Sequence, residues 1–110
     1  MSLLGMFSSV WSVPTIADLS RQVAQRSYAV VRDSVEVRAL SFARAEARGY
    51  IRAKAGPVIR EETRSLAERY PKLSPLALTT IVTQASERVV QTILADIGRQ
   101  RARETLRRVA

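Results

Sequence analysis

Apolar residues recur along most of this chain at intervals of three and four, the spacing of one face of an α-helix. Thr15 is a candidate N-cap, and Asp18 stands three residues later, where an acidic side chain completes a capping box. These signals predict one long helix over residues 15–54. The members of its apolar stripe are Ala24, Tyr28, Val31, Val35, Ala39, Phe42, Gly49 and Ala53.

Two stretches of this predicted helix are also compatible with other structures. Between residues 34 and 42, apolar residues alternate with Glu36 and Arg38, as they would in a strand. The density of Ala, Arg and Glu, and the lack of turn signals on either side, favour a helix. Gly49 costs ~1 kcal/mol in a helix interior, so it marks either a close-packing point or a break.

Proline and glycine divide the rest of the chain into two further helices. Gly56 can cap a helix that has Pro57 at its first position, which predicts a short helix over residues 57–70. Its buried stripe is Ile59, Thr63, Leu66 and Tyr70. Ser74 followed by Pro75 is a similar start signal for a helix over residues 75–108. The apolar face of this third helix is formed by Leu78, Val82, Ala85, Val89, Ile93 and Ile97, and a thinner stripe continues through Ala102, Leu106 and Val109.

The predicted fold class is therefore all-α: a long N-terminal helix, a short middle helix and a long C-terminal helix with a basic tail. A helix over residues 15–54 would be ~60 Å long, whereas a compact domain of this size has a radius of gyration near ~13 Å. The two other helices could not cover it. Either the chain folds back near Gly49 or the exposed stripe lies on a partner. We expect the partner, and an extended or helical-hairpin shape for a single domain over residues 14–110.

Residues 1–13 form an apolar, Ser-rich arm without any charge. The arm lacks the basic start and the cleavage pattern of a secretory signal. Together with the residues that follow, the arm is only loosely similar to an organelle transit sequence, because the first basic residue of the chain is Arg21. Phe7 and Trp11 suit a membrane interface or a groove on another protein, and an unattached tail is the alternative. The predicted partner or membrane contacts are Phe7, Trp11, Tyr28 and Phe42. No apolar run reaches the ~18 residues of a membrane-spanning helix.

The chain is strongly basic, with 18 Lys and Arg against 10 Asp and Glu and a net charge of +8. All but two of these cations are Arg, which fits bidentate contacts with phosphates or carboxylates, or the codon usage of a GC-rich genome. Five Arg and one Glu in residues 98–110 supply half of the net charge. Two ladders at i, i+4 spacing are the predicted contacts for an anionic partner: Arg44, Arg48, Arg52 and Arg99, Arg103, Arg107. Alternatively, each is a solvent-exposed helix side, and cations near a helix C-terminus also suit the helix dipole.

Catalytic chemistry is not indicated by any motif. The chain has no Cys and no His, which excludes disulfides, thiolate zinc sites and the usual general base. No phosphate loop, dinucleotide fingerprint or metal-ligand spacing is present. Acidic residues stand near Arg at helical spacing, as in Glu61 with Arg64 and Glu104 with Arg108, which predicts surface ion pairs. We expect no enzymatic activity, no cofactor and no small-molecule substrate.

The leading functional hypothesis is a non-catalytic helical subunit of a larger multi-protein assembly. The apolar arm places it beside a membrane, and a small basic accessory subunit of an energy-converting organellar complex, in the mitochondrial inner membrane, is the favoured case. Its partners would be protein subunits, with anionic lipid as a further contact. The alternative is a small basic nucleic-acid-binding protein, ribosomal or nucleoid-associated. A homo-oligomeric bundle is a variant of the first hypothesis.

Overall fold

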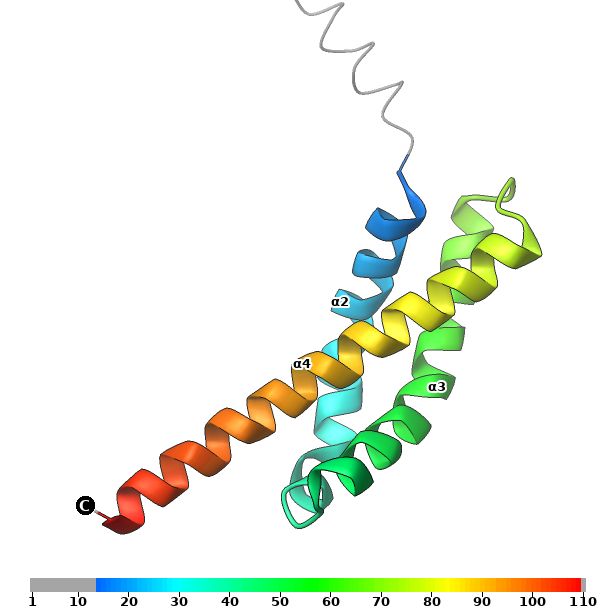
Figure 1. The fold of residues 1–110 in the computed structure, drawn as a ribbon. Coiled ribbons are helices and arrows are strands. Elements are labelled where there is room, and N and C mark those ends of the chain that lie inside the picture. The colour runs from blue at the N-terminus through cyan, green and yellow to red at the C-terminus, as the bar shows by residue number, and fades with distance from the viewer. Residues whose placement is uncertain (1–13, 110) are drawn as a thin grey trace, which may run out of the picture.

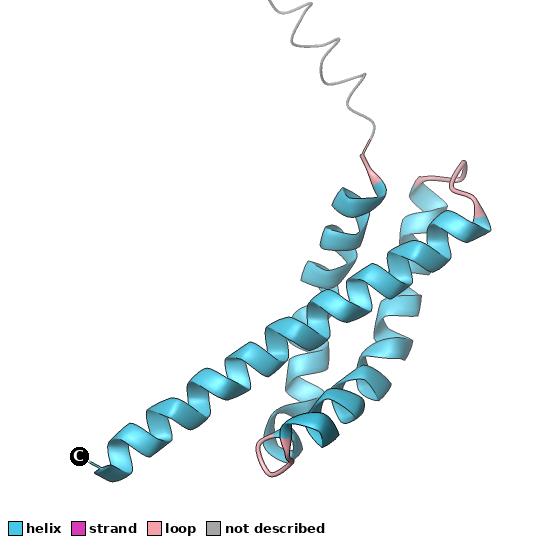
Figure 2. Cartoon of the chain, in the orientation of Figure 1, coloured by secondary structure: helices cyan, strands magenta, loops and turns pink. Residues whose placement is uncertain are grey.

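The computed structural model describes residues 14–109, except the side chains of residues 36 and 37, and contains three helices joined by two short connections (Figures 1 and 2). They are α2 (Ile16–Ala39), α3 (Arg44–Arg69) and α4 (Pro75–Val109). Within residues 14–109 there is no strand. The all-α prediction is confirmed, and the strand alternative for residues 34–42 is wrong.

Two predicted helix starts are confirmed by their capping hydrogen bonds. At α2, the Thr15 hydroxyl accepts from the backbone N–H of Asp18 and the Asp18 carboxylate accepts from the N–H of Thr15, both at 3.1 Å. This reciprocal pair is the capping box. At α4, the Ser74 hydroxyl accepts from the N–H of Ala77 at 3.0 Å. Each helix start therefore depends on hydrogen bonds between residues three positions apart.

The single long helix over residues 15–54 is wrong. α2 ends at Ala39, a turn occupies residues 40–43, and α3 runs back alongside α2 (Figure 1). The predicted stripe is correct as far as Phe42, but Gly49 and Ala53 are exposed. The buried positions of α3 that replace them are Ala47, Ile51 and Ala55. The fold-back lies at residues 40–43 and not near Gly49, so no ~60 Å helix remains for a partner to cover.

The predicted break at Gly56 and Pro57 is also wrong, because both residues lie inside α3. A proline in a helix interior costs about 3 kcal/mol. Burial of Ile51 and Ile59 on either side of it, both 0% exposed, contributes about 1.5–3 kcal/mol each. Tertiary packing therefore outweighs the local penalty. The stripe predicted after the proline is correct through Leu66.

The three helices cover one another around a single core. α3 is antiparallel to its neighbours, and α2 and α4 are parallel (Figure 1). The Ser20 hydroxyl donates to the Gln84 side chain at 2.9 Å near the start of this parallel pair. The core is aliphatic, as the scarcity of aromatic residues requires. Its fully buried side chains include Leu19, Val31, Val35, Ile51, Ile59, Leu66, Ile81, Val89, Val90 and Ile93.

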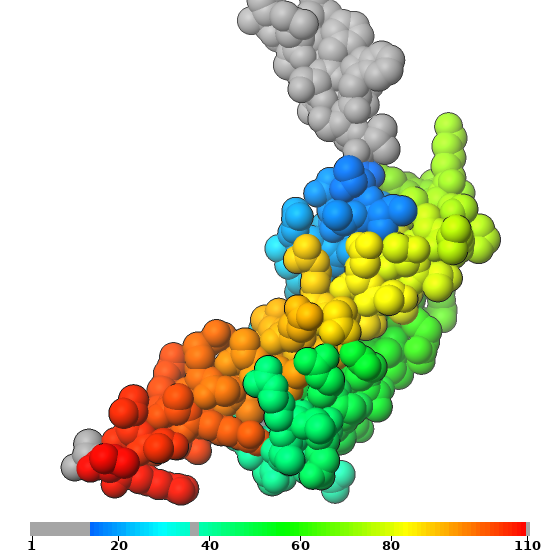
Figure 3. Space-filling view, in the orientation of Figure 1, coloured from blue at the N-terminus to red at the C-terminus, as the bar shows by residue number. Residues whose placement is uncertain are grey.

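The length of α4 gives the molecule its elongated outline. It has 35 residues, against 24 in α2 and 26 in α3, and is therefore ~52 Å long. Its buried positions end at Ile97. Beyond that point Arg101 still contacts the α2–α3 turn, and the end of the helix extends into solvent (Figure 3). The predicted extended shape is confirmed, and we call residues 98–109 the C-terminal projection.

Candidate interaction surface

The C-terminal projection exposes an apolar stripe. Ala102, Leu106 and Val109 follow one another at i, i+4 and i+7, which places them on one face of the helix. All three are exposed, and Leu106 and Val109 are 70% and 81% exposed. Large apolar side chains at such exposure, on a helix without a neighbouring element, form a surface that another molecule can cover.

The predicted C-terminal ladder lies beside this stripe. Arg99, Arg103 and Arg107 are all exposed, and together with Arg32 of α2 they line a hollow of about 520 Å³. Asp96, Gln100 and Glu104 complete its lining. The fold thus adds a fourth guanidinium, from a helix about 70 positions earlier in the chain, to the three that the sequence placed together.

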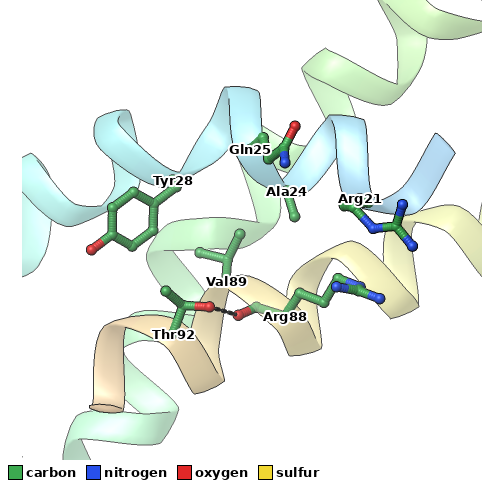
Figure 4. A pocket seen from close by; sticks show the side chains of 7 residues that line it. All are labelled: Arg21, Ala24, Gln25, Tyr28, Arg88, Val89 and Thr92. Carbon is green, nitrogen blue, oxygen red and sulfur yellow. Dashed lines mark hydrogen bonds between the residues drawn. The ribbon is translucent and has the colours of Figure 1, made fainter. Parts of the chain in front are cut away.

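A second hollow of about 350 Å³ lies further along the same pair of helices (Figure 4). The buried side chains of Ala24 and Val89 line its apolar part. Tyr28 stands at one end, and the guanidinium groups of Arg21 and Arg88 extend toward the other end from facing helices (Figure 4). This hollow therefore combines a small apolar surface with two cations.

A cluster around Asp96 joins the two hollows. The Tyr28 hydroxyl, which lines one hollow, donates to the carboxylate of Asp96, which lines the other. Arg32 donates to the Tyr28 hydroxyl at 3.1 Å, lies 3.6 Å from Asp96 and stacks over the Tyr28 ring at 5.9 Å. Arg99 pairs with the other oxygen of Asp96. Together the two hollows are lined by six arginines, which we call the arginine seam: Arg21, Arg32, Arg88, Arg99, Arg103 and Arg107.

The other predicted ladder is engaged within the protein. Arg48 and Arg52 of α3 pair with Glu87 of α4 at 3.3 and 2.8 Å. An anionic partner at these positions would have to compete with Glu87. Arg44, the third member, is exposed at the first position of α3. Among the predicted surface ion pairs, Glu61 with Arg64 is confirmed at 3.1 Å.

The predicted aromatic contacts have different surroundings. Tyr28 belongs to the cluster around Asp96, and Phe42 packs edge-on against Tyr50 with ring centroids 5.3 Å apart. Both are partly buried against the protein's own core. Phe7 and Trp11 lie outside the described residues. That any of the four contacts a partner or a membrane stays a prediction.

Arg101 has a role that the sequence pattern missed. Its guanidinium donates to the backbone carbonyls of Ala39 and Leu40 at 3.2 and 3.0 Å, and also to that of Phe42. The Ala39 carbonyl also accepts from the Phe42 amide at 3.3 Å. Arg101 adds donors at the end of α2, where the last carbonyls of a helix lack intrahelical partners. From the sequence alone, Arg101 is only one of the cations of the basic tail. Its partners are 59 to 62 positions away, so no local spacing could have revealed them.

Within residues 14–109 no group of three or more acidic residues could hold a metal ion. The pKa of Asp18 is lowered, first by its hydrogen bond to the Thr15 backbone and then by that to the Thr15 side chain, which reflects helix capping. None of the helices described here combines the length and apolar character needed to cross a membrane. Comparison with protein families, with curated proteins and with solved structures finds no match to this chain.

Proposed function

We propose that this protein is a non-catalytic helical subunit of a multi-protein assembly and that it docks through the C-terminal projection. The observation that carries the proposal is the exposed stripe of Ala102, Leu106 and Val109 on a part of α4 that no other described element covers. Covering the two larger side chains would contribute about 1.5–3 kcal/mol each. An i, i+4, i+7 stripe is the pattern by which one helix packs into a groove of another protein.

Helix stability gives a second reason. Isolated helices shorter than ~12–15 residues are marginal in water. The projection has 12 residues and Gly98 at its base. It persists as an extension of the packed part of α4, and a docked partner would stabilise it further. This coupling of folding and docking suits a subunit of an assembly.

The cellular location of the assembly is a prediction from the sequence alone. A position beside a membrane, in an energy-converting organellar complex, depends on the apolar arm over residues 1–13, which lies outside the described residues. The absence of enzymatic activity likewise stays an expectation from the residue types present.

Purification of the full-length protein from its source cells tests this proposal. The wild-type protein should co-purify with protein subunits in fixed stoichiometry and without nucleic acid. A Leu106→Asp, Val109→Asp double variant should lose those subunits and keep its helical circular dichroism. Leu76→Asp is the matched control, because Leu76 is 77% exposed at the opposite end of α4. Retention of the subunits by the double variant would refute docking through the projection.

A nucleic-acid-binding protein is the second candidate. The observation in its favour is the arginine seam, because Arg99, Arg103 and Arg107 follow one another at ~6 Å along the axis of α4 and could follow phosphates. Binding would then fall with salt by roughly one unit of log–log slope per phosphate contact. The apolar stripe beside the seam has no use in such a complex.

A further inference from the structure

The arginine seam is a line of like charges on one face of the α2–α4 pair. On α4, Arg88, Arg99, Arg103 and Arg107 are separated by 11, 4 and 4 positions, which keeps them on one side of the helix. From Arg88 to Arg107 the line is about 28 Å long. The seam is therefore long enough to contact several turns of an elongated ligand.

The protein neutralises this line only in part. Arg21 pairs with Asp18 at 3.4 Å, and Arg32 and Arg99 share Asp96. Among the described residues, Arg88, Arg103 and Arg107 have no carboxylate within ion-pair distance. Like charges four residues apart on a helix repel each other. Asp96 and Glu104 line the same hollow as these arginines but are outnumbered by them, and such an excess of cations favours anions supplied by another molecule.

The neighbouring apolar stripe indicates what kind of molecule would supply these anions. A helix that carries a carboxylate at every fourth residue repeats them every ~6 Å, the same rise as the ladder of Arg99, Arg103 and Arg107. Each carboxylate could accept two parallel hydrogen bonds from one guanidinium. The same helix could place an apolar face on Leu106 and Val109, which a phosphate backbone could not.

We propose that the arginine seam binds an amphipathic helix of a partner protein, one whose carboxylates repeat every four residues beside an apolar stripe. This inference rests on the proposed function and specifies the chemistry of the partner. The bound helix lies along the line between α2 and α4 and becomes the fourth helix of a bundle. A second copy of this chain is a poor occupant, because each copy carries a net charge of +8.

Two synthetic helical peptides of about 20 residues test the geometry. They have the same composition of Glu, Leu and Ala. One places Glu at every fourth position beside a Leu stripe, and the other distributes the same Glu around the whole helix. Fluorescence anisotropy at about 0.15 M salt should show binding of the first peptide to the full-length protein and at least about fivefold weaker binding of the second.

The protein side is tested by removing charges from the seam. Arg99→Gln, Arg103→Gln and Arg107→Gln together lower the net charge by three and should weaken binding of the patterned peptide about tenfold, since each lost exposed pair contributes a factor of roughly two. Circular dichroism should be unchanged, because all three residues are exposed.

A matched control removes the same charge elsewhere. Arg26→Gln, Arg60→Gln and Arg69→Gln are substitutions of exposed residues outside the seam, and together they should change the affinity by less than about twofold. Equal losses in both triple variants would show a general charge effect and would overturn the proposal. So would equal binding of the two peptides.

Other ligands provide the remaining outcomes. Duplex DNA, single-stranded RNA and vesicles containing an anionic lipid are measured at the same salt concentration. If any of these ligands binds more tightly than the patterned peptide, and the seam variant loses that binding, a protein helix is not the occupant.

If the native subunits still co-purify while the peptides fail to discriminate, the partner chemistry is wrong and the proposed function stands. If no subunits co-purify, the proposed function itself fails.

Discussion

Arg101 should contribute more to stability than any other cation of the basic tail. Its guanidinium closes the end of α2 by donating to the carbonyls of Ala39, Leu40 and Phe42. A hydrogen bond to a charged group contributes about 1.5–3 kcal/mol, and a cation at a helix C-terminus adds about 0.3–1 kcal/mol. Because one nitrogen makes all three bonds and water can reach the turn, we take the lower part of this range.

We therefore expect Arg101→Ala to lower the free energy of unfolding by about 2 kcal/mol. For a domain of this size, this corresponds to a fall in Tm of about 10 °C. Thermal and urea unfolding followed by circular dichroism at 222 nm measure both quantities. Arg101→Lys keeps the charge but not the planar fork, so its loss should be intermediate.

Arg103→Ala is the control for this measurement. Arg103 lies two residues away on the same helix, is exposed, and should change stability by less than about 0.5 kcal/mol. If Arg101→Ala and Arg103→Ala have the same effect, the closure of α2 by Arg101 contributes nothing measurable and the reasoning is refuted.

Four smaller effects should appear in the same unfolding assay. Thr15→Ala should cost about 1 kcal/mol through loss of the cap. Because folding lowers the pKa of Asp18, its contribution is full above the unfolded pKa and is lost as the pH falls below about 4, so the difference between wild type and Asp18→Asn should shrink there. Gly49→Ala should stabilise α3 by about 0.5–1 kcal/mol, since a methyl group at Gly49 would meet no atom within 4 Å. Ser27→Ala should be neutral or stabilising, by up to about 1 kcal/mol, because the buried Ser27 hydroxyl has no partner among the described residues; a clear loss of stability would show that it has one.

The parts of the fold that could be predicted from the sequence are those fixed by local interactions. The capping box of α2, the Ser74 cap of α4 and the apolar face of α4 depend on residues three or four positions apart, and these predictions are confirmed. The turn over residues 40–43 has no Gly, Pro or Asn, so no local sequence signal predicts it. Its Leu40 and Phe42 carbonyls accept from Arg101, and only the folded chain brings that residue to the turn.

Gly56 and Pro57 show the opposite error. They form a strong local signal for a helix boundary, but the burial of Ile51 and Ile59 outweighs it. The arginine seam was likewise predictable only in part. The ladder of the projection was predictable from spacing, whereas its continuation through Arg32 and Arg21 depends on how α2 packs on α4.

We also expect Pro57 to divide α3 into two segments of different local stability. Because proline has no amide hydrogen, the carbonyl of Ala53 has no α-helical partner at that position, and Ala53 is exposed to water. Amide exchange should therefore follow two regimes along this helix. The segment before the proline buries the small side chains of Ala47 and Ala55 and should exchange its hydrogens sooner, even though Arg48 and Arg52 pair with Glu87. The segment around Ile59 and Leu66 should exchange only when the whole bundle unfolds.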